Sequence, residues 1–109
     1  MVEIRQYVDR FGRNPFQLWL DLLKGATRAR ISTALVRLEG GNFSAVKGVG
    51  AGVFELRLDF GPGYRVYFGK DGDRIVILLG GGTKKRQQND IDRSCALWRQ
   101  YKEQRLEER

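Results

Sequence analysis

Two arginines near the middle of the chain have the type and spacing to bind a phosphate group. Arg57 and Arg65 flank the loop Gly61-Pro62-Gly63, within two segments of alternating polar and apolar residues, VFELRLDF and YRVYF. Each guanidinium presents several donors in a planar array that fits phosphate oxygens. If the segments pair as a hairpin, both arginines lie on one face of a rigid surface, where they suit a single phosphate.

The same alternation predicts how the hairpin pairs. A three-residue loop whose last glycine has positive φ would place Phe60 opposite Tyr64 and keep apolar residues facing apolar ones. In that register Asp59 lies opposite Arg65, and Arg57 lies diagonally from Arg65 on an exposed polar face. An ion pair between Asp59 and Arg65 is the alternative, purely structural interpretation of this pattern.

Length and composition narrow the class of protein. The chain has 109 residues, which is the size of one ordinary domain with one core. Its single cysteine, Cys95, excludes an internal disulfide framework, and the lack of histidine leaves no plausible zinc ligand set. A formal charge of +7 points to a nucleic acid or an acidic partner. With no apolar run near membrane-spanning length, we expect a cytoplasmic protein that contacts no membrane.

The chain before the hairpin predicts one strand and two helices. Alternating apolar residues from Val2 predict a strand that ends near Asp9. Asn14-Pro15 is a good helix start, because Asn14 can cap free amides and Pro15 lacks only an N–H that would be unpaired anyway. A second helix is predicted from about residue 26 to residue 39. The two helices should form an antiparallel hairpin that covers one side of the sheet.

The other segments around the hairpin predict a glycine-rich approach to it, a turn into one further strand, and a last helix. The glycine-rich run 47–52 is interpreted as a flexible or bulged strand entry, because a phosphate-cradling loop would follow a strand and open a helix. Asp71-Gly72 predicts a turn into a central strand, 75–79, that ends at the glycines 80–82. After a basic connector, 83–89, a helix should begin near residue 90, and residues 103–109 should fray.

These elements predict a small α+β domain over residues 1–109, with an N-terminal strand, a helical hairpin, a three-stranded antiparallel meander and a C-terminal helix. At this level the chain resembles the RelE/ParE superfamily of bacterial toxins, and within it the addiction-module killer proteins related to host-inhibition-of-growth toxins and phage Gp49-like proteins. The resemblance covers nearly the whole chain. Its landmarks include Trp19-Leu20, Glu55-Leu56-Arg57, Gly61-Pro62-Gly63-Tyr64-Arg65-Val66-Tyr67, Lys84, Gln87 and Asp90-Ile91.

The resemblance implies the toxin of a type II toxin–antitoxin module, most often a metal-independent endoribonuclease that cuts mRNA during translation. It further implies three partners: mRNA, the ribosome, and a cognate antitoxin, commonly a small helix-turn-helix protein that joins the toxin in a higher-order complex. No cofactor is expected. A different branch of the superfamily poisons DNA gyrase without nuclease activity, and an inactive antitoxin-binding remnant is a third alternative, because fold alone does not separate these functions.

Metal-free cleavage of RNA requires the ribose 2′-hydroxyl to attack the adjacent phosphate while charge and protons are managed around it. Arg57 and Arg65 are predicted as the phosphate clamp, and Lys84 as the residue for proton transfer or charge stabilisation. Glu55 is an alternative base. A solvated surface loop is the competing interpretation for Lys84 and its basic neighbours.

Four residues are predicted to bind the substrate around that centre. Lys85 and Arg86 extend the positive charge of Lys84, and Lys47 adds to it from the glycine-rich run. Tyr67, predicted on the exposed face opposite Arg57, is the candidate for stacking on a base.

Overall fold

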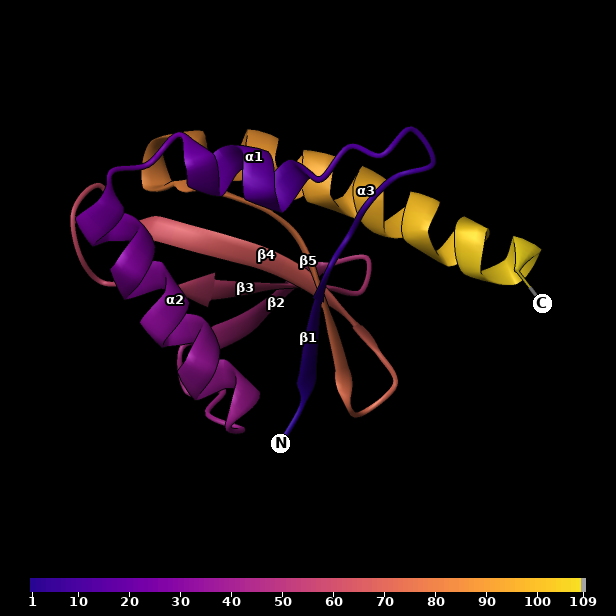
Figure 1. Ribbon diagram of the computed structural model, residues 1–109, viewed down its shortest axis with the longest axis horizontal. Coiled ribbons are helices and arrows are strands. Elements are labelled where there is room, and N and C mark those ends of the chain that lie inside the picture. Colours follow the sequence, from indigo (N-terminus) through magenta and orange to yellow (C-terminus); the bar gives the residue numbers. More distant parts are fainter. Residues whose placement is uncertain (109) are drawn as a thin grey trace.

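The computed structural model describes residues 1–108 as one layered unit in which helices cover both faces of a sheet (Figure 1). The strands and helices, in chain order, are β1 (Glu3–Gln6), α1 (Pro15–Asp21), α2 (Gly25–Glu39), β2 (Val46–Gly50), β3 (Val53–Arg57), β4 (Tyr64–Asp71), β5 (Ile75–Thr83), the 3₁₀ turn η1 (Lys84–Arg86) and α3 (Gln87–Glu107). The predicted α+β class is confirmed.

The five-stranded sheet has the order β1-β5-β4-β3-β2. Strands β2 to β5 form an antiparallel meander, and β1 lies parallel to β5 at one edge. The meander therefore has one strand more than the three predicted. The extra strand is β2, which occupies the glycine-rich run; Gly50, Ala51 and Gly52 all have positive φ and form its tight turn into β3. A register shift at Gly48 confirms the predicted bulge.

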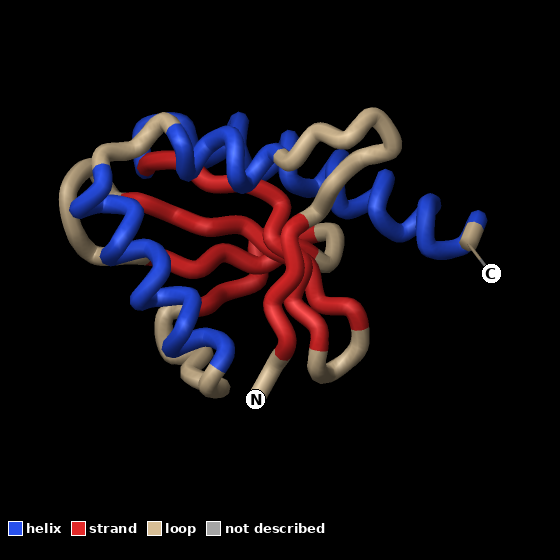
Figure 2. The backbone as a smooth tube through the Cα atoms, viewed as in Figure 1, coloured by secondary structure: helices blue, strands red, loops and turns tan. Residues whose placement is uncertain are grey.

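Helices lie on both sides of the strands (Figure 2), and each face of the sheet carries its own apolar core. Helices α1 and α2 cover one face, where Phe16, Ile31 and Leu38 pack against inward residues of the central strands. Helix α3 covers the other face through Trp98, which is buried against Ile77. The prediction that α1 and α2 cover one side of the sheet is confirmed. Because α3 covers the other side, β5 is apolar on both of its faces.

The start of α1 follows the prediction. Asn14 has extended backbone angles, and its side-chain oxygen accepts the amide N–H of Gln17 at 3.1 Å. Pro15 occupies the first helical turn, where its missing N–H leaves no hydrogen bond unmade. This cap fixes where α1 begins on the face of the sheet. Trp19 of α1 then packs against the core that contains Phe16, Ile31 and Leu38.

The glycines 80–82 do not end β5, which continues to Thr83. They are needed because helices approach both faces of the strand closely. A Cβ on Gly81 would lie 2.3 Å from Trp19 Cε3, and a Cβ on Gly82 would lie 1.9 Å from Asp90 Oδ2. The sequence signal for a strand end is therefore a signal for close helix packing.

Replacing Gly81 by alanine should destabilise the fold by roughly 1 to 3 kcal/mol, because the new methyl group collides with the Trp19 ring. Urea unfolding followed by tryptophan fluorescence measures the change. Gly80→Ala is the matched control from the same run, since its nearest heavy atom would be 4.0 Å away. Equal stability of the two variants would contradict this packing.

Helix α3 begins at Gln87, three residues before the predicted start, and remains helical to Glu107. The helix thus runs through most of the tail, 103–109, that was predicted to fray; residue 109 lies outside the described residues. The second half of the helix is anchored to the β4–β5 turn, where Asp71 Oδ2 accepts the Tyr101 hydroxyl at 2.7 Å and pairs with Arg105 Nη1 at 3.1 Å. Tyr101 and Arg105 of α3 are thus both bound to Asp71 at the β4–β5 turn.

This anchor should make stability pH-dependent at high pH. Burial, and then the hydrogen bond to Asp71, raises the pKa of Tyr101 to about 12, above the ordinary value of 10. The neutral phenol is favoured in the folded state, so its contribution is complete below pH 10 and is lost between about pH 10 and 12. Denaturant unfolding across this range should show a shallower decline for Tyr101→Phe than for the unsubstituted protein. Parallel declines would contradict the assignment.

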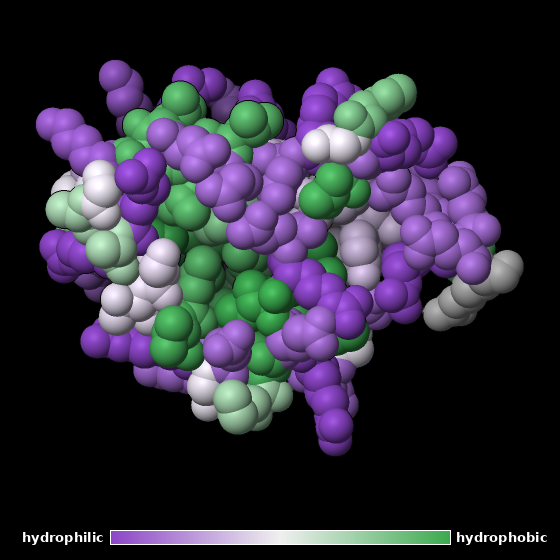
Figure 3. Space-filling view, in the orientation of Figure 1, coloured by the Kyte–Doolittle hydropathy of each residue, from purple (hydrophilic) through white to green (hydrophobic). Residues whose placement is uncertain are grey.

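The surface is largely polar, with an apolar exception along α1. Figure 3 shows hydrophobic side chains near this helix and again across the lower middle of the same face, and Leu18 and Leu22 of α1 are 61% and 83% exposed. Among the helices of residues 1–108, none is both long enough and apolar enough to span a bilayer.

Candidate active site

The two predicted clamp arginines are direct cross-strand partners. In the structure Arg57 lies opposite Arg65 and Glu55 lies opposite Tyr67, so the predicted pairing of Asp59 with Arg65 and of Arg57 with Tyr67 is wrong. The assignment of faces is correct, because these side chains share one side of the sheet. Like charges opposite one another are unfavourable unless acids or a ligand offset them.

The connection between β3 and β4 explains the different register. Leu58 N–H donates to Tyr64 O at 2.9 Å, so the last residue on the β3 side that pairs with Tyr64 is Leu58. The predicted three-residue loop would have paired Phe60 with Tyr64 instead. Phe60 N–H then donates a hydrogen bond to Leu58 O at 3.0 Å. The Phe60 ring packs toward α2, with the Arg30 guanidinium 3.8 Å from its centroid. Gly63 has φ +78°, as predicted for the last loop glycine.

Glu55 is the centre of a buried polar cluster beside the two arginines. Its side chain is 1% exposed, and its Oε1 lies 3.2 Å from Nε of Arg65, whose side chain is 7% exposed. Gln87, at the start of α3, donates from Nε2 to Oε1 at 2.7 Å, and Lys47 Nζ lies 3.8 Å from Oε2. Glu55 is therefore enclosed by donors and unsuited to the role of an exposed base.

Gln87 was not assigned a role from the sequence. It belongs to the basic connector in the predicted arrangement, whereas the structure places it in the first turn of α3 and against Glu55. The only sequence signal was its place among the residues of the family resemblance. Through this contact, α3 helps to fix the carboxylate that holds Arg65.

Lys84 is brought to Arg65 by the Gly61-Pro62-Gly63 loop. The Lys84 amide lies 3.3 Å from Pro62 O, and Arg65 Nη1 donates to Gly63 O at 2.7 Å. A Cβ added to Gly63 would lie 3.0 Å from Arg65 Nη1 and 3.2 Å from Lys84 Cβ. Glycine at this position therefore allows the backbone of both elements to approach, and places an exposed lysine beside a buried arginine.

Arg57 is the accessible arginine of the pair. Its side chain is 58% exposed, and its Nε lies 3.1 Å from Oδ1 of Asp59, which is 80% exposed. An exposed pair of this kind is weak, so a phosphate can compete with Asp59 for the guanidinium. Arg65 differs, because its Nε and Nη1 face Glu55 and Gly63 O, which leaves Nη2 for a ligand.

The remaining predicted substrate-binding residues separate into three positions. Lys47 joins the Glu55 cluster. Lys85 has an exposed side chain in the same 3₁₀ turn as Lys84. Arg86 instead lines a second groove, between α1 and α3, together with Asp90. The structure thus does not bring Arg86 to the two clamp arginines.

Tyr67 cannot stack on a base, because it is completely buried beneath α3. Burial, followed by the carboxylates of Glu55 and Asp90, raises the pKa of Tyr67 well above its usual value, and no hydrogen bond of normal geometry to its hydroxyl is found among residues 1–108. Burial also raises the pKa of Asp90, whose Oδ2 accepts no hydrogen bond from the described part of the chain. The prediction of an exposed Tyr67 fails because α3 covers this face of the sheet.

Arg57, Arg65 and Lys84, which we call the cationic cluster, can bind and neutralise an anion at the loop end of the hairpin. Two of its members are exposed, and the third is fixed by a buried carboxylate. Within residues 1–108, no group of three or more potential metal-ligating side chains comes together. The chemistry that the described residues offer is that of fixed positive charge and N–H donors.

Fold and site together define a small basic α+β protein with a candidate anion site at one end of a β-hairpin. The model of the family described as "phage derived protein Gp49-like" matches residues 18–94, a range that contains the whole cationic cluster. An uncharacterized protein of Haemophilus influenzae is 45% identical over 83 residues, which cover 75% of this chain and 84% of the relative. The chain belongs to the phage-derived Gp49-like family, a family of addiction-module toxin-like proteins.

Proposed function

We propose that this Gp49-like protein is a toxin of the RelE/ParE type that cleaves mRNA as an endoribonuclease during translation and thereby inhibits growth. The observation that carries the proposal is the convergence of Arg57, Arg65 and Lys84 at the Gly61-Pro62-Gly63 loop. The family membership supports a toxin, and the charge of +7 supports a polyanionic substrate.

The proposed reaction is attack of a ribose 2′-hydroxyl on the adjacent phosphate. The new bond joins the 2′-oxygen to phosphorus, and the bond from phosphorus to the 5′-oxygen of the next nucleotide breaks. Products are a 2′,3′-cyclic phosphate and a 5′-hydroxyl. The proton of the 2′-hydroxyl passes to solvent and the leaving 5′-oxygen takes a proton from Lys84 or from solvent, so neither an oxidant nor a co-reactant is needed.

Each residue of the cationic cluster has a distinct part in this reaction. Arg57 is exposed and binds the scissile phosphate directly. Arg65, held by Glu55, supplies fixed charge and its remaining donors to the phosphorane oxygens. Lys84 is exposed beside them and donates to the developing oxyanion or to the leaving oxygen. The ribosome supplies further ordering of the message.

The activity test uses purified protein in a translating extract, with mRNA 5′ ends mapped by primer extension. New ends within the coding region are expected from the unsubstituted protein and should diminish with Lys84→Ala. Arg99→Ala, which removes an exposed cation of α3, is the matched control and should leave the ends unchanged. An extract that translates without new ends contradicts the nuclease proposal; inhibition of gyrase supercoiling would then identify the alternative toxin class.

We also propose that a cognate antitoxin, a small helix-turn-helix protein, neutralises this toxin within a higher-order complex. The high positive charge of the chain supports a partner with acidic segments. Co-expression of the adjacent small gene product should restore growth and co-purify with the toxin in fixed stoichiometry.

A further inference from the structure

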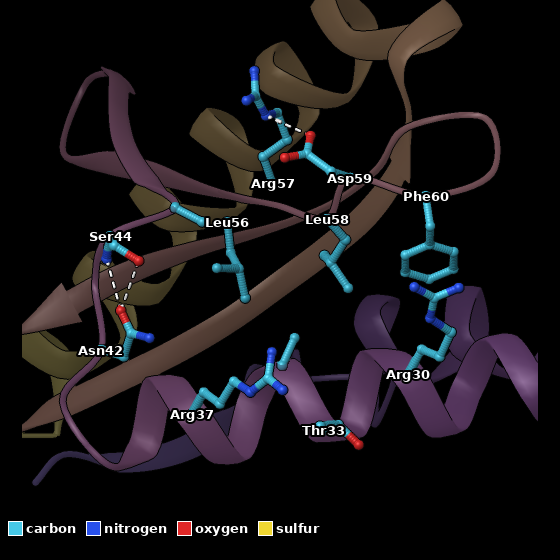
Figure 4. Close-up of a pocket in the computed structure, with 12 residues that line it drawn as sticks. Arg30, Thr33, Arg37, Asn42, Ser44, Leu56, Arg57, Leu58, Asp59 and Phe60 are labelled. Atoms are coloured by element: carbon cyan, nitrogen blue, oxygen red, sulfur yellow. Dashed lines mark hydrogen bonds and ion pairs between the residues drawn. The ribbon is translucent and has the colours of Figure 1, made fainter.

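A groove that meets the cationic cluster only at Arg57 runs between α2 and the C-terminal end of β3 (Figure 4). Its volume is about 330 Å³. In Figure 4 the side chains of Leu56 and Leu58 point toward α2 and form an aliphatic floor, whereas Arg57 points to the opposite side of the strand. The groove and the Glu55 cluster therefore lie on opposite faces of β3.

The rim of this groove carries two arginines that the fold does not pair with acids. Arg30 and Arg37 both extend from α2 beside the groove (Figure 4), and neither takes part in an ion pair among residues 1–108. Arg30 stacks over the Phe60 ring at 3.8 Å. The one acid of the lining, Asp59, already pairs with Arg57. Two guanidiniums therefore remain for an anionic partner.

The remaining polar rim also offers a donor. The Asn42 side-chain oxygen accepts both the amide N–H and the hydroxyl of Ser44, at 3.0 Å and 2.8 Å. This arrangement leaves the Asn42 amide nitrogen as the part of that side chain open to a ligand. Donors above an aliphatic floor match a partner that carries carboxylates beside aliphatic side chains.

The spacing of the arginines indicates the form of that partner. Arg30 and Arg37 are seven residues apart on α2, which is two helical turns or about 10.5 Å. A second helix lying along α2 would match them with carboxylates seven residues apart, and its intervening aliphatic residues would face Leu56 and Leu58. RNA fits less well, because the aromatic ring here, Phe60, is already covered by Arg30.

We propose that this groove is a docking site for an acidic amphipathic helix of a partner protein. The helix places carboxylates on Arg30 and Arg37 and aliphatic side chains on the floor formed by Leu56 and Leu58. Arg57 lines one edge of the groove, but the proposed contacts use Arg30 and Arg37, which lie outside the cationic cluster. A binding measurement therefore tests it whether or not the chain is a nuclease.

The probe is a fluorescein-labelled synthetic helical peptide of about 20 residues, with glutamates every seventh position and leucines three and four positions after each glutamate. Fluorescence anisotropy measures its binding to the full chain. The charge reversal Arg30→Glu with Arg37→Glu should weaken binding by about tenfold or more. A peptide with lysines in place of the glutamates should bind this double variant better than it binds the unsubstituted protein.

Arg93→Glu with Arg99→Glu is the matched control, because it removes two exposed α3 arginines and changes the net charge equally. It should leave peptide affinity within about twofold. The proposal is overturned if both double variants weaken binding equally, if the glutamate peptide does not bind, or if an oligouridine of about 12 nucleotides displaces it and depends on Arg30 and Arg37 to the same degree. Circular dichroism confirms that each variant is folded.

Discussion

Replacing Arg65 by alanine is expected to reduce RNA cleavage by about 10²- to 10³-fold, the scale on which an enzyme loses rate when one fixed donor to a developing oxyanion is removed. Arg65 is suited to this effect because Glu55 and Gly63 O hold its guanidinium in place before substrate binds. Preorganised charge needs no rearrangement when the phosphorane forms. Quantifying new mRNA ends over time in a translating extract measures the loss.

A control must separate this loss from a loss of folding, because Arg65 is buried. Arg65→Lys retains the charge but loses the planar donor array, so it should keep more of the fold than alanine while remaining impaired in cleavage. Each variant is compared at a concentration of folded protein set by its unfolding curve. Cleavage by folded Arg65→Ala at an unchanged rate would remove Arg65 from the site.

The largest expected loss of stability comes from Glu55→Ala, at roughly 3 to 5 kcal/mol in the free energy of unfolding. The substitution leaves the guanidinium of Arg65 buried without its carboxylate and removes the acceptor of Gln87 Nε2. Burying an unpaired charge is far more costly than losing an exposed pair. Urea denaturation followed by circular dichroism measures the difference.

Asp59→Ala provides the contrast. Asp59 also pairs with an arginine of the hairpin, but both side chains are more than half exposed. Its removal should change the unfolding free energy by less than about 1 kcal/mol. If Glu55→Ala costs no more than Asp59→Ala, the buried pair does not hold the hairpin as described.

The pattern of side-chain types predicted the faces of the central hairpin but not its pairing. Because the side chains of a strand alternate with a period of two, matching the apolar faces of the two strands puts Arg57 and Arg65 on one side in the predicted register and also in the observed one, which differs from it by an even number of residues. The register depends on the loop, and no local rule shows that Phe60 leaves the strand to pack beneath Arg30. The neighbours of each arginine were therefore predicted wrongly, although their shared face was right.

Burial of the polar face could not be predicted from the hairpin alone. Tyr67 and Glu55 alternate with apolar residues as exposed side chains would, yet α3 covers them. That cover depends on a helix that begins at Gln87, inside a stretch whose composition resembles a basic loop. The glycines 80–82 misled in the same way, since a strand end and a close helix contact both require a small residue.

The convergence of Lys84 with Arg65 is a tertiary effect of the same kind. Nineteen positions separate the two residues in the sequence, and Pro62 O and Gly63 bring them together across the sheet. The residue types were informative, because a chain without histidine has few other groups for phosphate chemistry. Their arrangement required the fold.

The central claim, attack by a 2′-hydroxyl, is tested most directly by the chemistry of the product ends. A message that carries a single 2′-deoxynucleotide on the 5′ side of a mapped cleavage position is compared in the translating extract with its all-ribose counterpart. Cleavage at this position should disappear from the deoxy-substituted message, and the all-ribose products should end in a 2′,3′-cyclic phosphate and a 5′-hydroxyl. Cleavage of the deoxy-substituted message, with a 5′-phosphate on the downstream fragment, would contradict that claim.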